Sequence, residues 1–398
     1  MNRGEEMHGG EGPKRPLTIG MFTDTYIPET NGVVTSLVST AAALRRLGHR
    51  VIIVAPAHVE GDVEDPDVFS LRSASFPFYP EFRMAFPLPA KILAALPQLP
   101  FDVVHVQSFF FIGCLGAYLA RLRKVPLFFT YHTRFTEYAH YTPAPHRVTK
   151  AQVVWISREF SNRCDQVIAP SAGTVELLRS YGVDKPIHVI PSGVNLQGFA
   201  KDGPTPPAIL AARPAPVLLY VGRLAKEKNL DLLLDAFALL LVRRPDAQLV
   251  VVGDGPHRAE MELRISSAPL REHVRLVGEV AQRDLGAYYR DADAFVFAST
   301  SETQGLVLLE AMAHGLPVVA VDCPVTREVV GTRAGILTAE DPTALASALE
   351  QFIGESLDGR AERSAAAIEA AAPANVDHLT RELERLYVRA AGNLAVAQ

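Results

Sequence analysis

The sequence predicts an α/β protein of two doubly wound domains, each built on a parallel sheet with helices on both faces. Short runs of apolar, β-branched residues alternate with helical patterns along the whole chain, which is typical of βαβ units. The chain has 398 residues, more than a single compact core usually holds. Residues 201–216 interrupt this alternation with a proline-rich stretch, so we expect a linker there.

The first half of the alternation follows a polar tail at residues 1–16, which lacks the apolar core of a signal peptide. A helix is expected at Val33–Leu47, with Gly48 at its C-terminal cap. Residues 17–200 therefore form a predicted N-terminal Rossmann-like domain. Its strands are expected at Leu17–Phe22, Val51–Ala55, Val103–Val106, Leu127–Thr130, Gln166–Ala169 and Ile187–Ile190.

The second half restarts the pattern after the linker and predicts a C-terminal Rossmann-like domain at residues 217–374. A last segment, 375–398, places its apolar residues on one helical face and is expected to close the fold by packing on a sheet. In open parallel sheets, ligands bind beyond the carboxyl ends of the strands, so we expect a cleft there between the domains. The strands are expected at Val217–Val221, Gln248–Val252, Val274–Val277, Ala294–Ala298 and Pro317–Ala320.

Composition excludes several classes of protein. The net charge of −5 gives no argument for nucleic-acid binding. The three cysteines are far apart in the sequence, which fits a reducing cytoplasm and indicates neither a disulfide framework nor a metal site. No run of about 18 apolar residues is present to span a membrane. P-loop, nucleophile-elbow and zinc-protease motifs are absent, and the Asp291/Asp293 pair leads into a buried strand, so we expect no catalytic metal.

The segment STSETQGLVLLE, residues 299–310, follows a predicted strand and opens a helix. The backbone N–H groups of Gly305, Leu306 and Val307 would be free at the helix N-terminus, where they attract phosphate. Glu302, in the loop, could accept hydrogen bonds from sugar hydroxyls, and Glu310 could bind two ribose hydroxyls. The alternative is that Glu302 only caps the helix and Glu310 is a surface glutamate.

Two further loops follow predicted strands of the second half. In VGRLAKEKN, residues 221–229, Arg223 and Lys228 could hold a diphosphate and stabilise a leaving nucleotide, although isolated they would be ordinary surface cations. In GDGP, residues 253–256, Asp254 lies in a tight turn that could line a nucleotide pocket or be only a turn.

The first half contributes two candidate loops. In TDTYIPETNGVV, residues 23–34, Asn31 is a natural N-cap, and Gly32 would let a phosphate or sugar approach the helix end. This is not the glycine fingerprint of dinucleotide-binding proteins. In TYHTRFTEYAHY, residues 130–141, His132 could hydrogen-bond a transferred sugar, although a lone histidine is more often structural. The candidate acceptor contacts are Asp24, Tyr26, Asn31, Tyr131 and Arg134.

Over residues 16–390 these motifs resemble the retaining glycosyltransferases of the GT-B fold, family 4. The spacing of Glu302 and Glu310 and the Arg223/Lys228 pair carry the resemblance. It implies that Arg223 and Lys228 bind the donor diphosphate, that Glu302 and the following amides hold the donor sugar, and that Glu310 holds the ribose. It also implies that His132 lies near the reacting carbon, Gly32 in a phosphate-facing loop and Asp254 beside the nucleotide.

The segments DTYIPETNGV and FTYHTRFTEYAHY are most similar to the branch that glycosylates lipids, which includes diacylglycerol glucosyltransferases and phosphatidylinositol mannosyltransferases. The resemblance implies a metal-independent hexosyltransferase without a cofactor. UDP-glucose or UDP-galactose is the favoured donor, and a lipid such as diacylglycerol the favoured acceptor, although another hydroxyl acceptor would also serve. GDP-mannose transfer to a lipid and sugar-nucleotide 2-epimerisation are the alternatives. Members often carry a tryptophan near the final crossover helix, which this chain lacks because its single tryptophan is Trp155.

Two segments suggest a membrane surface as a further partner. Phe76–Pro89 mixes aromatic residues with Arg83, and Arg147–Arg163 places basic side chains around apolar ones. Such surfaces can lie in a lipid headgroup layer, or they can simply cover the core. We therefore expect a cytoplasmic protein that binds peripherally to the inner face of the cell membrane.

Overall fold

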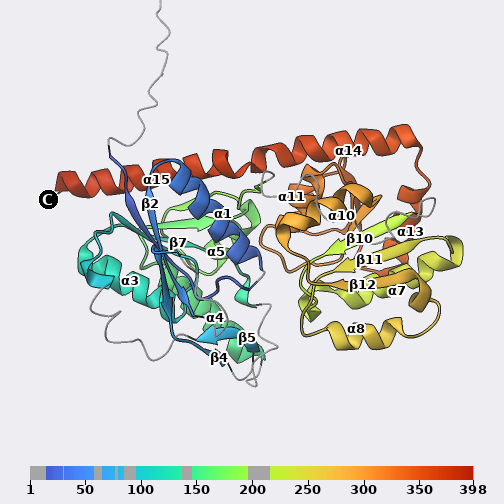
Figure 1. Cartoon of the computed structure of the whole chain (residues 1–398), viewed down its shortest axis with the longest axis horizontal. Coiled ribbons are helices and arrows are strands. Elements are labelled where there is room, and N and C mark those ends of the chain that lie inside the picture. Colours follow the sequence, from blue (N-terminus) through green and yellow to red (C-terminus); the bar gives the residue numbers. More distant parts are fainter. Residues whose placement is uncertain are drawn as a thin grey trace, which may run out of the picture.

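The computed structural model describes residues 15–29, 31–57, 65–76, 79–84, 96–136, 146–195 and 216–397. Two lobes lie side by side, and the last two helices run along one edge of the molecule over both of them (Figure 1). Each lobe contains one parallel sheet, so the predicted α/β class with two Rossmann-like domains is confirmed. Apart from Pro216, the predicted linker lies outside the described residues, as do residues 1–14 of the predicted tail.

The N-terminal lobe contains a seven-stranded parallel sheet in the order β3-β2-β1-β6-β7-β8-β9. Apart from β9, the strands of this sheet are mostly apolar, as expected for strands covered on both faces. The order reverses direction at β1, which has β2 on one side and β6 on the other. The strands are β1 (Thr18–Phe22), β2 (Arg50–Pro56), β3 (Val68–Leu71), β6 (Val103–Val106), β7 (Leu127–Thr130), β8 (Gln166–Ala169) and β9 (Ile187–Val189).

Helices cover both faces of this sheet. On one face, α3 (Phe111–Arg123), α4 (His146–Ser161) and α5 (Ala172–Ser180) pack on a core that includes Phe129 and Phe160. On the other face, α1 (Gly32–Arg46) packs beside α15 (Val376–Ala397). A separate antiparallel hairpin joins β4 (Ala74–Phe76) and β5 (Tyr79–Met84), and a short 3-10 helix, η1, spans Leu96–Gln98.

The C-terminal lobe contains a six-stranded parallel sheet in the order β12-β11-β10-β13-β14-β15. The strands are β10 (Val217–Val221), β11 (Gln248–Val252), β12 (Val274–Gly278), β13 (Ala294–Phe297), β14 (Val318–Val321) and β15 (Gly335–Thr338). The helices are α7 (Leu230–Arg243), α8 (Arg258–Ile265), α9 (Leu270–His273), α10 (Leu285–Asp291), α11 (Leu306–Ala313), α12 (Pro324–Val329), α13 (Pro342–Ile353) and α14 (Leu357–Ala371). Three 3-10 helices complete it: η4 (Lys226–Lys228), η5 (Gln282–Asp284) and η6 (Ala372–Ala374).

The strand and helix predictions were accurate where a segment is a buried apolar run. The strand predicted at Pro317–Ala320 begins and ends one residue later, at β14, and proline has no N–H for a sheet hydrogen bond. Helix α1 begins at Gly32, capped by Asn31, and Gly48 has a positive φ just beyond its end, as expected. The strands β3, β4, β5 and β15 were not predicted; β3 and β15 lie at the edges of their sheets, and β4 and β5 form a separate hairpin.

The last helix, α15, packs on the N-terminal lobe and not on the C-terminal lobe that precedes it in the sequence. Helix α14 lies over the C-terminal lobe, and α15 continues from it across to the N-terminal lobe (Figure 1). There Leu383 and Tyr387 join the core under β1 and β2, and the Tyr387 hydroxyl lies 2.5 Å from His105 Nδ1 on β6. Arg46 of α1 also pairs with Asp377. The N-terminal domain is therefore completed by the C-terminal end of the chain.

Candidate active site

The candidate site of the C-terminal lobe lies where strand order reverses, between β10 and β13. The loops after β10 and β13 leave neighbouring strands at their carboxyl ends. They are tied together because the hydroxyls of Ser299 and Ser301 both donate to the carbonyl of Glu227. Such a reversal is where ligands bind in open α/β sheets. The residues predicted in VGRLAKEKN and STSETQGLVLLE are thus brought together.

Lys228 and Glu302, one from each of these loops, form an ion pair. About a fifth of each side chain is exposed. Burial alone would lower the pKa of Lys228, but the neighbouring Glu302 carboxylate raises it above the ordinary value. The ammonium is therefore retained in a partly desolvated position. Arg223 lies in the same loop, with its Nη1 3.7 Å from Glu227 Oε1, so two cations and two carboxylates share this end of the sheet.

The GDGP turn packs directly against the Arg223 loop. The N–H of Leu224 donates to the carbonyl of Asp254, and a Cβ on Gly253 would lie 1.9 Å from the carbonyl oxygen of Gly222. Gly253 also has a φ of +138°, which L side chains rarely adopt. The Asp254 carboxylate pairs with Arg258 at 2.9 Å and is half-exposed. The turn thus fixes the backbone from which Arg223 projects.

The N-terminus of α11 is the predicted phosphate-facing end. Gly305 caps it with a φ of +71°, a conformation in which glycine is not strained. Within the described residues, no protein acceptor takes the N–H groups of Gly305, Leu306 or Val307. These donors carry the partial positive charge of the helix end and lie in the same loop as Glu302.

Glu310 lies inside the domain rather than on its surface, so the alternative that it is a surface glutamate is excluded. It is 4% exposed, and its carboxylate accepts hydrogen bonds from Tyr289 Oη at 2.9 Å and Gln282 Nε2 at 3.1 Å. Burial raises the pKa of this carboxyl to about 7. A ribose that binds Glu310 would therefore have to replace these two hydrogen bonds with bonds from its own hydroxyls. Ribose binding at Glu310 stays a prediction.

His132 follows β7 and belongs to the other lobe. Its Nε2 lies 2.7 Å from Oε1 of Gln107, which follows the adjacent strand β6. Burial lowers the pKa of His132 to about 4, so the imidazole is neutral near pH 7. A neutral ring that donates Nε2–H to the Gln107 carbonyl keeps Nδ1 as an acceptor. Gln107 was not predicted, because a single glutamine after a strand forms no recognisable motif.

Hydrogen bonds connect the Glu302 loop of the C-terminal lobe with loops of the N-terminal lobe. Thr303 Oγ1 donates to the carbonyl of His132 at 2.6 Å, and Ser171 Oγ donates to the carbonyl of Thr303 at 2.6 Å. The side-chain amide of Gln304 exchanges two hydrogen bonds with the backbone of Ser192. The Glu302 loop is therefore held against the His132 loop. None of Thr303, Gln304, Ser171 and Ser192 was predicted, because their partners lie in the other lobe.

Three predicted acceptor contacts are corrected by the structure. Asp24 is buried, and its carboxylate accepts from the Ser108 hydroxyl and from the N–H groups of Ile112 and Gly113, so it caps α3. Tyr131 is fully buried and packs edge-on against Phe129 and Phe135. The ring of Tyr26 belongs to the core beside α15. In this structure none of the three presents a side chain to an acceptor.

The remaining first-half candidates stay on or near the surface. Asn31 accepts from the N–H groups of Val33 and Val34, so it is the predicted N-cap of α1. Gly32 is exposed, and a Cβ there would meet no atom within 4 Å. Arg134 Nη1 donates to the carbonyl of Thr300 at 3.4 Å, which adds another contact between the lobes. The structure therefore leaves open space for a ligand at Gly32, whereas Asn31 and Arg134 are engaged with the protein.

Comparison with known proteins identifies the family. Residues 206–372 match "Glycosyl transferases group 1" and residues 30–197 match "Glycosyltransferase Family 4". An alpha-monoglucosyldiacylglycerol synthase of Streptococcus pneumoniae is 33% identical over 80% of this chain and 74% of its own length. The chain belongs to the family 4 glycosyltransferases of group 1. The diacylglycerol synthase agrees with the resemblance to the lipid-glycosylating branch. A GDP-mannose-dependent alpha-mannosyltransferase of Mycolicibacterium smegmatis is 29% identical over 85% of this chain and 89% of its own.

Solved structures confirm the GT-B fold of this glycosyltransferase. A sucrose-phosphate synthase of Thermosynechococcus elongatus aligns with a TM-score of 0.73 at 21% identity, covering 96% of this chain and all of the other. The Anabaena protein HepE, solved in complex with UDP and glucose, aligns with a TM-score of 0.73 at 19% identity over 93% of this chain and 99% of the other. At these identities the likeness concerns the fold alone.

Proposed function

We propose that this glycosyltransferase moves a hexose from a UDP-sugar, glucose or galactose, to the hydroxyl of a lipid such as diacylglycerol, with retention of anomeric configuration. The observation that carries the donor part is the Lys228–Glu302 pair beside Arg223 and the free amides of α11. These groups offer positive charge and N–H donors to a diphosphate without a metal ion. Two relatives that are alpha-monoglucosyldiacylglycerol synthases, from Streptococcus pneumoniae and Acholeplasma laidlawii, support this choice of acceptor and sugar.

Binding of the donor would break the Lys228–Glu302 ion pair. A diphosphate that approaches Lys228 would compete with Glu302 for the ammonium, and the released carboxylate would then accept hydrogen bonds from sugar hydroxyls. Asp254 and Gly32 would line the nucleotide and phosphate side of the site. His132, neutral and fixed by Gln107, would offer Nδ1 to a hydroxyl near the reacting carbon.

In the proposed reaction, the bond between the anomeric carbon and the diphosphate oxygen breaks while a bond to the acceptor oxygen forms on the same face. The acceptor hydroxyl proton passes to the leaving diphosphate. Arg223, Lys228 and the α11 amides stabilise the charge that develops there, and no covalent enzyme intermediate is formed. Contacts between the lobes through Thr303 and Ser171 would exclude water and limit hydrolysis.

The test is a donor-by-acceptor screen with product mass and anomeric NMR. Lys228→Ala and Glu302→Ala are each expected to lower kcat by about 10²-fold or more, with the fold intact by circular dichroism. Lys226→Ala is the matched control, because this neighbouring cation is 67% exposed and pairs only distantly with Glu260. Wild-type turnover in Lys228→Ala would contradict the proposal.

Two alternatives remain distinguishable in the same screen. A GDP-mannose-dependent mannosyltransferase, as in the mycobacterial relatives, would give a mannosylated lipid from GDP-mannose and no product from UDP-glucose. A sugar-nucleotide 2-epimerase would convert the donor without any acceptor. Incubation of the protein with each sugar nucleotide alone separates the epimerase from both transferases.

A further inference from the structure

A hollow of about 270 Å³ lies at the amino ends of two strands of the C-terminal sheet. Two of its lining residues, Asp293 and Pro317, directly precede β13 and β14. The loops of the candidate site follow the carboxyl ends of β10 and β13, so the hollow lies at the other end of the sheet. Its remaining walls come from α10, α14 and the segment between α11 and β14. We call it the amino-end hollow, and none of its described lining residues was predicted to contact the donor or the acceptor.

Helix α14 contributes one face of its first two turns to the amino-end hollow. The lining residues of this face are Leu357, Arg360, Ala361 and Ser364. Leu357, the first residue of the helix, is 79% exposed, so the protein leaves most of this apolar side chain uncovered. The Arg360 side chain follows within one turn and is 30% exposed. A bound molecule could therefore cover Leu357 and contact the Arg360 guanidinium at the same time.

Two arginines give the hollow a net positive charge. Arg290 lines it from the last turn of α10 and Arg360 from α14, against one carboxylate among the described lining residues, that of Asp293. Asp293 Oδ2 accepts from the N–H of Val217 at 2.9 Å, and its Oδ1 lies 3.9 Å from Arg360 Nη1. The Arg360 Nε is buried and has no hydrogen-bond partner within the described residues. A buried donor without an acceptor is unfavourable, and an anionic oxygen in the hollow would satisfy it.

The hollow shares residues with the surroundings of Glu310, the predicted ribose ligand. Tyr289 belongs to the wall of the hollow, and its hydroxyl donates to the Glu310 carboxylate at 2.9 Å. His314 also lines the hollow and stacks on the Tyr289 ring, with ring centroids 5.3 Å apart. Its Nδ1 lies 2.8 Å from the carbonyl oxygen of Glu310. A ligand that fixes this stack would hold the Tyr289 hydroxyl on Glu310.

We propose that the amino-end hollow binds a small phosphate ester, and that its occupation weakens the binding of the nucleotide donor. Two guanidinium groups suit the oxygens of a phosphate, and Leu357 and Ala361 offer apolar contact to the carbon part of the ester.

The direction of the coupling follows from Glu310. A ribose there must replace the hydrogen bond from Tyr289, which a ligand in the hollow would keep in place. By linkage, the donor and the ester weaken each other's binding by the same factor. This coupling rests on the proposed function, whereas the binding site itself does not.

Isothermal titration calorimetry tests the site in the Arg223→Ala/Lys228→Ala protein, in which the proposed donor phosphate site is disabled. Glycerol 3-phosphate is titrated in one arm and inorganic phosphate in the other. Both should bind at one site, the ester more tightly because only the ester contacts Leu357. On this background Arg290→Gln and Arg360→Gln should each weaken binding of the ester by about tenfold or more. Leu357→Ala should remove the advantage of the ester over phosphate.

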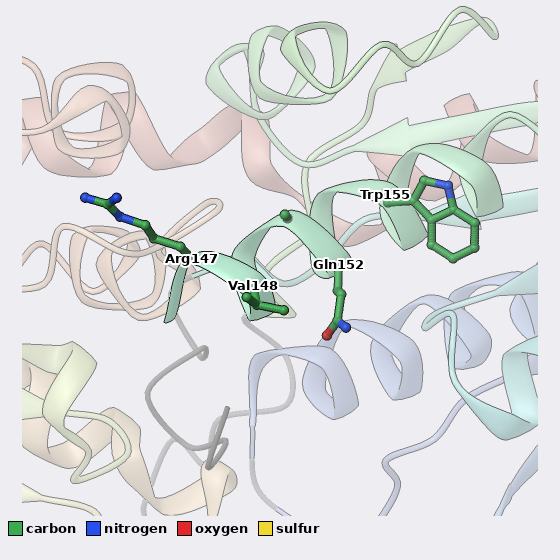
Figure 2. Close-up of a pocket in the computed structure, with 5 residues that line it drawn as sticks. Arg147, Val148, Gln152 and Trp155 are labelled. Carbon is green, nitrogen blue, oxygen red and sulfur yellow. The ribbon is translucent and has the colours of Figure 1, made fainter. Parts of the chain in front are cut away.

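Arg147→Gln is the matched control for the arginine substitutions. Arg147 is exposed and lines a separate, open hollow of about 450 Å³ on α4, whose walls are almost entirely apolar. Figure 2 shows Arg147 at the beginning of this helix and Trp155 further along it. Because α4 belongs to the N-terminal lobe, Arg147→Gln should bind glycerol 3-phosphate like its parent protein. All three arginines are at least partly exposed, so the melting temperatures of these variants should match that of the parent.

The coupling is tested with donor sites intact. Glycerol 3-phosphate should weaken UDP binding to the wild type by about fivefold or more, and Arg360→Gln should abolish this effect. Tyr289→Phe keeps the ring that stacks on His314 and removes the hydroxyl that donates to Glu310. It should therefore bind glycerol 3-phosphate normally, while its affinity for UDP no longer responds to the ester.

The outcomes separate failure of this inference from failure of the proposed function. Binding of glycerol 3-phosphate that depends on Arg290 and Arg360, in a protein that transfers no sugar, would keep the site and refute the function. The site is refuted if glycerol 3-phosphate does not bind the Arg223→Ala/Lys228→Ala protein, or if binding survives both Arg290→Gln and Arg360→Gln. Equal weakening of UDP binding in the wild type and in Arg360→Gln would show direct competition at the donor site and refute the coupling.

Discussion

At the scale of single residues, the candidate site depends on pairs that join different loops. Lys228 and Glu302 were predicted from their motifs, because a cation or a carboxylate after a strand is visible in the sequence. Their ion pair was not, since it depends on β10 lying beside β13. Gln107, Thr303 and Ser171 were missed for the same reason. Asp24 and Tyr131 were misassigned because the sequence does not show which polar residues of a loop turn inward.

Gln107 should position His132 rather than touch substrate. Replacement of Gln107 by Leu removes the acceptor of His132 Nε2–H, so kcat should fall about tenfold or more with little change in donor KM. Gln107→Glu should place a carboxylate beside the ring and raise its pKa from about 4 into the range of ordinary assays. A new ionisation in the pH profile of kcat, matched by ¹⁵N NMR of the histidine, checks this. An unchanged profile in Gln107→Glu would refute the positioning role.

Glu310 should make stability depend on pH near neutrality. Its folded pKa of about 7 lies above the ordinary value of 4.5, so the folded state is favoured when the carboxyl is protonated. The contribution is fully present below about pH 4.5 and is lost as the pH rises through 7. Glu310→Gln should remove this loss and gain up to about 3 kcal/mol relative to the wild type at pH 8, but little at pH 4. Equal gains at both pH values in denaturant unfolding would contradict it.

At the scale of elements, tight turns after buried strands place the functional side chains. The apolar strands β10, β11 and β13 were predicted from their composition, the GDGP segment after β11 was predicted as a tight turn, and Gly305 was placed at the start of a helix. What the sequence could not show is how closely the GDGP turn packs on the Arg223 loop. The strands β3 and β15, four residues each at the edges of their sheets, were missed.

Gly253→Ala should damage the site through the backbone. The added Cβ would lie 1.9 Å from the carbonyl oxygen of Gly222 at a positive φ, so the two turns must separate. We expect a loss of about 1 to 3 kcal/mol in the free energy of unfolding and weaker binding of UDP. Gly392→Ala is the control, because that glycine lies in exposed helix with no atom near its Cβ, and alanine should be neutral or stabilising there. Similar melting curves for Gly253→Ala and the wild type would argue against the close packing.

At the scale of the whole molecule, the last helix of the chain packs on the N-terminal lobe. Helix α15 was predicted from its apolar face, but the sequence does not say which sheet that face covers. The structure places it on the N-terminal lobe, where His49 pairs with Glu384 at 2.9 Å and Tyr387 contacts His105. No helix among the described residues is long and apolar enough to cross a membrane. Helix α15 thus belongs to the packing of the N-terminal lobe, although it follows the C-terminal lobe in the sequence.

Tyr387→Ala tests this crossing. The side chain is fully buried against Phe128 and His105, so its loss should cost about 3 to 5 kcal/mol and destabilise the N-terminal lobe first. Limited proteolysis should then cleave within residues 17–200 before the C-terminal lobe. Arg385→Ala, on the exposed side of the same helix, should leave the pattern unchanged. Protection of the N-terminal lobe in Tyr387→Ala would show that α15 is dispensable there.

The most direct measurement is a crystal structure of the protein with UDP bound. The diphosphate should lie within about 3 Å of donors on Arg223, Lys228 and the α11 amides, with Lys228 no longer paired to Glu302. That arrangement would establish that these groups bind the donor diphosphate. The proposed reaction near His132 requires this binding. A diphosphate bound elsewhere, with the Lys228–Glu302 pair still intact, would contradict it.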